Sequence, residues 1–191
     1  MTTRQLEVIQ AAAKILTQSG VSGLTIKNVA REMGFSESAL YRHFKSKEHI
    51  ILTMLHFVLQ QVDSAFIFKL NSMFAPEEKL TALFKNQFSF FKKNQHLAVA
   101  IFSDGLLEES KRINEMLLTI ISTRKKLLEP IIQEGQKRGV FRKDLSANEL
   151  THITMGAVRL LMYKWRIRQF QFDIEKQGAK LIGSILKLIL N

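Results

Sequence analysis

Residues 34–47 of the chain read GFSESALYRHFKSK, and this stretch decides how the first fifty residues fold. Gly34 supplies the backbone freedom that a sharp turn needs, and Ser36 is a good N-cap for a short helix over about 36–44. The preceding stretch, TIKNVAREM at 25–33, has a helical pattern of its own, with Thr25 as its expected N-cap. Two helices joined by a tight turn form a helix-turn-helix, a motif that places its second helix in the major groove of DNA.

The rest of the chain has the pattern of long helices. Only two prolines and nine glycines interrupt 191 residues, and 46% of the residues are apolar against 24% charged. This composition is typical of a globular protein with a packed core. We therefore expect an all-α fold of about nine helices. A three-helix head, residues 1–47, would be followed by a larger helical bundle, residues 48–191.

Apolar periodicity and capping signals predict where the helices lie. Gly20 follows the first helix at the position of a left-handed cap, and Pro76 suits the first turn of a later helix. Ser146 and Glu149 have the spacing of a capping box. The predicted helices cover about 4–19, 25–33, 36–44, 47–71, 76–94 and 110–138, with one or two short helices in 96–109 and two more beginning near 146 and 173.

The charge balance favours a polyanionic partner. The formal net charge is +11. Residues 1–47 carry seven Lys and Arg against three Asp and Glu, a net charge of +4, and the remaining residues carry +7. The basic residues are therefore not confined to the head. Nucleic acid is the first expected partner and an anionic membrane the second. The apolar run 50–59 is too short to span a bilayer, and no apolar signal segment opens the chain, so we expect a cytoplasmic protein with no membrane partner.

Several chemistries are not expected. The chain has no cysteine, which excludes disulfides and thiolate metal sites. It contains no Gly-rich phosphate loop, no nucleophile elbow and no His-Glu-x-x-His motif, so an enzyme is not expected. His49 and His56 are seven residues apart without a carboxylate at matching spacing, so no metal site is predicted. No cofactor is predicted either.

The head resembles the tetracycline-repressor (TetR) family of bacterial transcriptional regulators. The matching residues are Gly23-Leu24-Thr25, Val29-Ala30, Gly34-Phe35-Ser36 and the run LYRHFKSK at 40–47. The resemblance is specific over about the first 50 residues, and beyond them only chain length and helical pattern fit. It implies DNA contacts at positions in both helices of the motif and at the start of the next one.

The chemistry of these positions agrees with such contacts. Thr25 and Lys47 lie at helix starts, where amides, hydroxyls and ammonium groups bind phosphate, and the first turn of the third helix points at base edges. Tyr41 and His43 could instead pack between helices, and Glu37 could merely favour the helix dipole. The predicted DNA-binding residues are Thr25, Lys27, Ser36, Glu37, Ser38, Ala39, Tyr41, Arg42, His43 and Lys47.

The resemblance also implies an inducer pocket in the larger bundle. Its middle helices are rich in Phe and Met, although a helical bundle needs such residues for its core in any case. An apolar ligand with one polar or acidic end is the expected inducer. The candidate pocket residues are Phe84, Phe88, Phe91, Phe102, Met116, Arg124, Met155, Arg159 and Met162.

The last two helices carry apolar stripes that suit a dimer interface, although an intramolecular core would show the same pattern. The resemblance implies that these helices form a four-helix dimer bundle. A short recognition helix covers few base pairs, so a two-fold pair would double the site. The candidate interface residues are Leu150, Ile153, Ala157, Leu160, Ile174, Gly178, Leu181, Ile185 and Leu188.

These features together predict a ligand-responsive transcriptional regulator. We expect a homodimeric repressor that binds a near-palindromic DNA operator and is released by a small apolar or amphipathic inducer, with the fourth helix coupling the two regions. The alternative is a basic helical protein that binds membrane surfaces or carries a ligand without recognising DNA sequence. That alternative leaves the residues from Thr25 to Lys47 unexplained.

Overall fold

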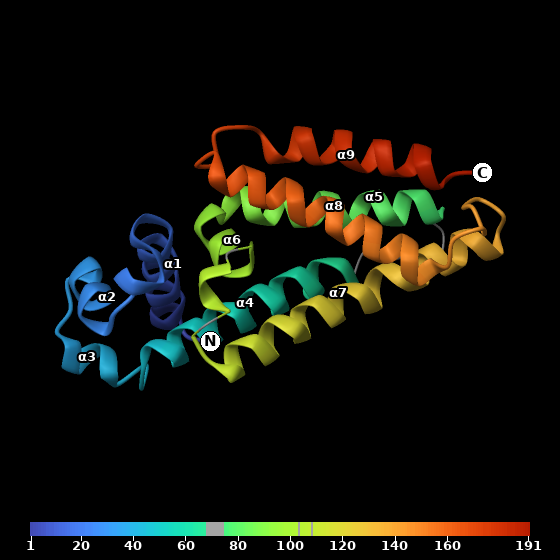
Figure 1. Cartoon of the computed structure of the whole chain (residues 1–191). Helices are drawn as coiled ribbons and strands as arrows, with labels where there is room; N and C mark the ends of the chain where they lie inside the picture. Colours follow the sequence, from blue (N-terminus) through green and yellow to red (C-terminus); the bar gives the residue numbers. More distant parts are fainter. Residues whose placement is uncertain (68–74, 103, 108) are drawn as a thin grey trace. The chain divides into compact units, whose positions relative to one another are not determined.

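The computed structural model describes residues 1–67, 75–102, 104–107 and 109–191, and within 62–67 it describes the backbone alone. Helices dominate the described residues (Figure 1). The prediction of an all-α fold is confirmed. The helices are α1 (Thr3–Gly23), α2 (Ile26–Met33), α3 (Glu37–Tyr41), α4 (Lys47–Ile67), α5 (Pro76–Lys93), α6 (Gln95–Phe102), the 3-10 turn η1 (Asp104–Leu106), α7 (Lys111–Lys137), α8 (Ala147–Ile167) and α9 (Ile174–Ile189).

The chain forms two compact units. The first contains Met1–Gln60 and Asn94–Thr119, and the second contains Gln61–Lys93 and Ile120–Asn191. Helices α4 and α7 therefore each contribute residues to both units. The predicted functional boundary between residues 47 and 48 stays a prediction.

The first unit is built around α1, which packs against α2 and α6 (Figure 1). The apolar stripe of α1 is buried between Val8 and Leu16, and Leu40 and Phe44 are fully buried as well, as their spacing predicts. Gly20 leaves helical geometry, with φ 66° and ψ −169°, at the predicted end of the first helix, yet a last helical stretch continues to Gly23. An ion pair of 2.5 Å between Lys14 and Glu32 joins α1 to α2.

Local hydrogen bonds shape the turn between α2 and α3. Thr25 caps α2 by accepting from the Asn28 amide at 3.1 Å, and Ser36 caps α3 by accepting from the Ala39 amide at 3.2 Å. Gly34 ends α2 in the left-handed region, at φ 67° and ψ 30°. A side chain there would be strained, which is why glycine suits the turn. These three predicted roles are confirmed.

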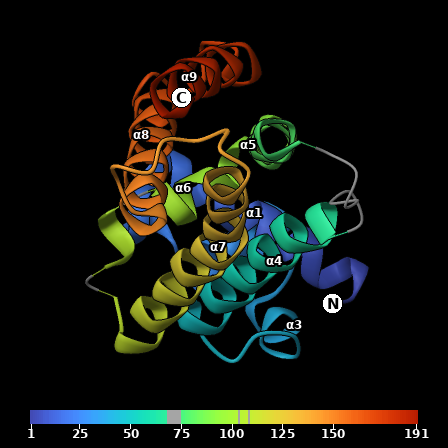
Figure 2. The same cartoon turned by 90° about the vertical axis from the view of Figure 1, so that its right-hand side faces the viewer.

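In the second unit, α9 lies against both α5 and α8 (Figures 1 and 2). The contact with α5 is close because Gly178 faces the ring of Phe88, where a β-carbon would lie 2.3 Å from ring atoms. Ser146 and Glu149 form the predicted capping box at the start of α8. Pro76 occupies the first turn of α5, as predicted.

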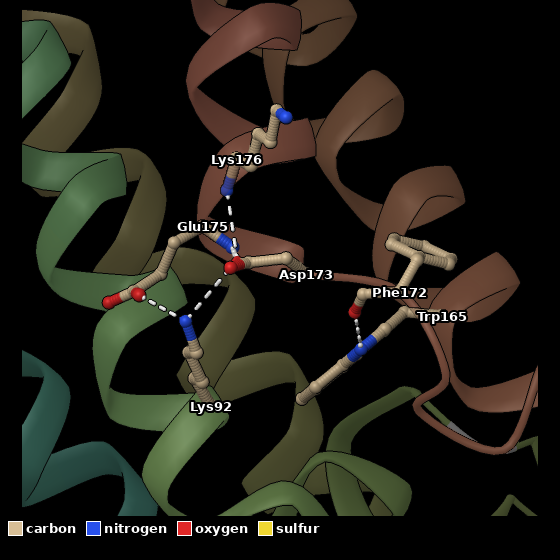
Figure 3. Close-up of polar contacts among 6 residues, drawn as sticks. All are labelled: Lys92, Trp165, Phe172, Asp173, Glu175 and Lys176. Carbon is tan, nitrogen blue, oxygen red and sulfur yellow. Dashed lines mark hydrogen bonds and ion pairs between the residues drawn. The ribbon is translucent and has the colours of Figure 1, made fainter.

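Figure 3 shows how the α8–α9 connection is held. The indole Nε1 of Trp165 donates to the Phe172 carbonyl at 2.9 Å, and Asp173 caps α9 by accepting from the amides of residues 175 and 176. From α5, the ammonium of Lys92 contacts Asp173 at 3.1 Å and Glu175 at 2.7 Å. The hydrogen bonds that the Lys92 ammonium donates to Glu175 and Asp173 raise the pKa of Lys92, and they attach α5 to the first turn of α9.

Candidate DNA-binding site

The exposed surface of α3 is the centre of the candidate site. The helix covers Glu37–Tyr41, so it is shorter than the predicted 36–44, and Arg42 and His43 lie in the turn that follows. At its end the turn tightens, because the His43 amide bonds to the Leu40 carbonyl three residues back, at 2.9 Å. Leu40 is buried, and it anchors the opposite face of the helix to the core.

The predicted contact residues lie on the surface of the first unit. Thr25, Lys27, Ser36, Glu37, Ser38, Tyr41, Arg42 and His43 are exposed, whereas Ala39 and Lys47 are half-buried. Tyr41 is 52% exposed, which argues against a role in packing between helices. Among the described residues neither Lys27 nor Arg42 forms an ion pair, so both cations face solvent.

Two contacts of this region were not predicted from the sequence. The ammonium of Lys47 lies 2.8 Å from a carboxylate oxygen of Glu109. The guanidinium of Arg4 lies 4.8 Å from the centroid of the Phe35 ring, so α1 supports the turn between α2 and α3. Both join residues far apart in the sequence, and no local pattern indicates them.

Part of the predicted pocket set comes together in the second unit. Phe84 and Phe88 are buried on α5 with ring centroids 6.4 Å apart, and the Arg124 guanidinium lies 5.8 Å from the Phe84 ring. Arg124 also donates a short hydrogen bond to Gln87, which is buried on the same face of α5. Phe91 and Met162 are buried in this unit, Met155 is half-buried and Arg159 is exposed. Phe102 and Met116 belong to the first unit.

Thr151 and Thr154 are functional candidates that the sequence did not single out. Both lie on the buried stripe of α8 and are at most 1% exposed. Within the described part of the chain, neither hydroxyl has a hydrogen-bond partner. A buried hydroxyl without a partner is costly and rare, so it marks a place where a bound molecule could supply the missing bond.

The predicted dimer-interface residues divide into two groups. Leu150, Ile174, Gly178 and Ile185 are buried by the chain itself, so their assignment to an interface is corrected to a role in the core of the second unit. Leu181 and Ala157 are half-buried. Ile153, Leu160 and Leu188 are exposed, at 55%, 67% and 68%.

The exposed apolar residues of α8 follow a heptad pattern. Ile153, Gly156, Leu160, Tyr163 and Ile167 recur at alternating steps of three and four, and none of them is buried. Such a seam is typical of a helix that packs against a second helix outside the chain. We call these five residues the α8 seam.

Other kinds of site receive no support from the described residues. None of their groups of His, Asp and Glu could hold a metal ion, and none of their helices is long and apolar enough to cross a membrane.

One face of the short helix α3 is buried against the core, and its other face is exposed directly after a glycine turn. This arrangement defines a helix-turn-helix protein of the DNA-binding class. Comparison with known proteins agrees. Residues 8–54 match the model of bacterial regulatory proteins of the tetR family, and residues 54–190 match the C-terminal region of YsiA-like proteins. The chain belongs to the TetR family, and it is a DNA-binding transcriptional regulator of the ligand-responsive kind.

Individual relatives extend over nearly the whole chain. The transcriptional repressor KstR2 of Mycolicibacterium smegmatis is 31% identical over 96% of this chain and 89% of its own length. The fatty acid degradation regulator FadR of Bacillus halodurans has the same fold, with a TM-score of 0.86 at 17% identity over 97% of this chain and 96% of its own. FadR of Bacillus subtilis, solved with stearoyl-CoA, has a TM-score of 0.82 at 17% identity over 95% and 97%. The prediction of a regulator is confirmed over the membrane-surface alternative.

Proposed function

We propose that the protein is a homodimeric repressor whose two α3 helices enter successive major grooves of a near-palindromic operator. The observation that carries this proposal is the exposed set on and around α3, backed by buried Leu40 and Phe44. Ser38 and Arg42 would contact base edges, whereas Thr25, Lys27, Tyr41 and Lys47 would contact phosphates. We propose no catalytic role for the chain, and a chromosomal DNA target would be consistent with a cytoplasmic protein.

The α8 seam supports a dimer of two such chains. A continuous line of exposed apolar side chains is costly in water, and a two-fold related copy of the same helix would cover it. Gly156 is the smallest residue of the seam, and it would let the two helices approach closely. The resulting pair of heads would match the two half-sites of the operator.

The second unit supports an amphipathic ligand. Its described core is aromatic and aliphatic, yet it contains the Arg124–Gln87 pair and the two unpartnered threonine hydroxyls. A ligand with an apolar body and a polar or acidic end would use both kinds of surface. Two of the relatives regulate fatty acid metabolism or degradation by name, and one was solved with stearoyl-CoA, so long-chain acyl compounds are the first class to test.

The direct test begins with duplexes selected by the protein from a randomised library. Fluorescence anisotropy on the selected duplex and on a scrambled one, at two salt concentrations, should show a preference of at least about a hundredfold. Equal and steeply salt-dependent binding to both duplexes would contradict sequence recognition.

The ligand is tested on the same complex. Stearoyl-CoA, stearate and coenzyme A are added separately, and a ligand of the proposed class should dissociate the operator. Release of the operator by stearoyl-CoA alone would indicate that the protein recognises both the acyl chain and the coenzyme A group. Release by none of the three compounds would contradict a long-chain acyl ligand. The protein is also mixed with anionic liposomes, and operator DNA is then added. Liposome binding that the operator does not reduce would favour a membrane-surface role.

A further inference from the structure

The first turn of α4 is tied to the start of α7 by three polar contacts within the first unit. Lys47 pairs with Glu109 at 2.8 Å, Ser110 donates to Glu48 at 2.6 Å, and Arg112 lies 3.3 Å from the other oxygen of Glu48. Two adjacent residues of α4 thus contact three residues near the start of α7. We call these five residues the α4–α7 clasp.

Ser110 fixes the position of Glu109 in the clasp. Its hydroxyl oxygen accepts from the Ile113 amide at 3.2 Å, which caps α7, while the same hydroxyl donates a hydrogen bond to Glu48. One side chain therefore both starts α7 and attaches it to α4. Because Glu109 directly precedes this anchor, its carboxylate is held beside the ammonium of Lys47.

The Lys47–Glu109 pair is better shielded from water than an ordinary surface pair. The two side chains are 30% and 29% exposed, whereas those of Lys111 and Glu115, also near the start of α7, are 91% and 60% exposed and 3.8 Å apart. Partial shielding and a short distance strengthen the attraction and reduce its screening by salt. The carboxylate is therefore an effective competitor for this cation.

We propose that Glu109 competes with operator phosphate for the Lys47 ammonium and so lowers the DNA affinity of the repressor. To bind a phosphate, Lys47 has to leave Glu109, and the freed carboxylate then repels that phosphate. Glu109 is thus a positioning residue for a DNA contact, although it lies outside the helix-turn-helix. The inference rests on the proposed role of Lys47 as a phosphate contact.

The clasp also connects DNA affinity to the rest of the chain. Helix α7 begins directly after Ser110 and continues into the second unit, to Lys137. A shift of α7 along its axis would move Glu109 relative to Lys47 and change the strength of the competition. Ligand-driven movement of α7 would then alter operator affinity without any change in α3 itself.

A double-mutant cycle tests this competition. Four proteins are compared on the selected duplex by anisotropy in the absence of ligand: wild type, Glu109→Gln, Lys47→Ala and the double variant. Glu109→Gln should tighten binding by about two- to fivefold, the range for one partly shielded ion pair. Lys47→Ala should weaken binding and reduce the salt slope by about one. In the Lys47→Ala background, Glu109→Gln should have almost no effect.

Glu115→Gln is the matched control, because it removes the same charge from the same region without touching the head. It should leave affinity within about 1.5-fold of wild type. The proposal would be overturned if Glu109→Gln and Glu115→Gln tightened DNA binding equally, because the effect would then be general charge repulsion. It would also be overturned if Glu109→Gln still tightened DNA binding in the Lys47→Ala background. Weaker binding by Glu109→Gln in a protein whose melting temperature is unchanged would overturn it as well.

Failure of the underlying function gives a different pattern. If wild type selects no duplex, the repressor proposal itself is wrong and the competition falls with it. If wild type binds its operator but Lys47→Ala binds equally well, the repressor proposal stands and the inference about Glu109 is overturned.

Discussion

At the scale of single residues, Tyr41 combines a large ring with high exposure. It is 52% exposed at the end of α3, so its ring contributes little to the core of the head. We predict that Tyr41→Ala weakens binding to every duplex by about five- to tenfold through loss of a phosphate contact. The melting temperature should change little, since surface substitutions usually stay within about 0.5 kcal/mol.

Ser38 supplies the contrast for that experiment. Its hydroxyl lies 3.0 Å from the hydroxyl of Ser36, at the exposed start of α3. Ser38→Ala should change the order of preference among selected duplexes rather than weaken all of them equally. An equal loss on all duplexes would remove Ser38 from base recognition, and a Tyr41→Ala effect on one duplex only would remove Tyr41 from phosphate contact.

Thr151 permits a second prediction at the scale of single residues. One substitution should stabilise the ligand-free protein and weaken the stabilisation that a bound ligand provides. Replacing Thr151 by valine removes a buried hydroxyl that has no partner in the described residues and keeps its shape. Thr151→Val should therefore raise the ligand-free stability by about 1 kcal/mol. It should also reduce the thermal shift produced by a bound acyl ligand such as stearoyl-CoA.

The control is Thr81→Val on α5, whose exposed hydroxyl already donates to the Glu77 carbonyl at 2.8 Å. It should change neither quantity appreciably. A loss of ligand-free stability in Thr151→Val would show that its hydroxyl is satisfied, contrary to the proposal. Thermal melting with and without ligand measures both effects.

At the scale of helices, the α5–α9 contact depends on the absence of a side chain at Gly178. A β-carbon there would lie 2.3 Å from ring atoms of Phe88, which is itself buried and cannot withdraw freely. Gly178→Ala is expected to destabilise the protein by about 1–3 kcal/mol through overpacking. Chemical denaturation measures this change.

Gly183 provides the comparison on the same helix. Apart from the local backbone of α9 and the two chain neighbours of Gly183, no atom of the described residues lies within 4 Å of a β-carbon placed there, so Gly183→Ala should gain up to about 1 kcal/mol of helix propensity. Similar effects from the two substitutions would mean that close packing at Gly178 is not what holds α9 to α5.

The ion pair between α5 and α7 makes part of the stability depend on pH. The Lys79 ammonium lies 2.7 Å from Glu134, and this hydrogen bond lowers the pKa of Glu134 below its ordinary value of 4.5. A lowered folded-state pKa means that the contribution is fully present above pH 4.5. It is lost as the pH falls from there through the folded-state pKa.

Glu134→Gln should therefore reduce the melting temperature at pH 7, and the difference from wild type should shrink as the pH falls below 4.5 and disappear below the folded-state pKa. Thermal melts over a pH series measure it. A difference that persists unchanged when the Glu134 carboxyl of the wild type is protonated would show that Glu134 acts through packing rather than through its charge.

At the scale of the whole molecule, the α8 seam predicts the oligomeric state. Leu160 is 67% exposed at the centre of the seam, so a lysine there costs the isolated chain little. Buried in a dimer, the same ammonium would face its own copy across the two-fold axis. Leu160→Lys should therefore convert a dimer to a monomer in sedimentation experiments and weaken operator binding at least about tenfold.

Leu118→Lys is the control, because Leu118 is equally exposed, at 64%, but lies on α7 outside the seam. It should leave the mass and the operator affinity unchanged. A dimer that survives Leu160→Lys would place the interface elsewhere, and a monomeric wild type would contradict the homodimer.

The amino-acid sequence alone determined the helix-turn-helix and the family. Thr25, Gly34 and Ser36 act through hydrogen bonds and backbone angles within a few residues, so their roles follow from local sequence. The periodicity of α8 and α9 likewise predicted that both are amphipathic. Local interactions of this kind hardly depend on the rest of the chain.

Only the tertiary structure decided which apolar residues the chain itself covers. Leu150 and Ile153 have similar apolar character, three residues apart on α8, yet one is buried and the other exposed. The pairing of Lys47 with Glu109 and the fit of Gly178 against Phe88 were equally absent from any local pattern. Burial and long-range pairing depend on which helix lies against which, and that follows from the packing of the whole chain rather than from the spacing within one helix.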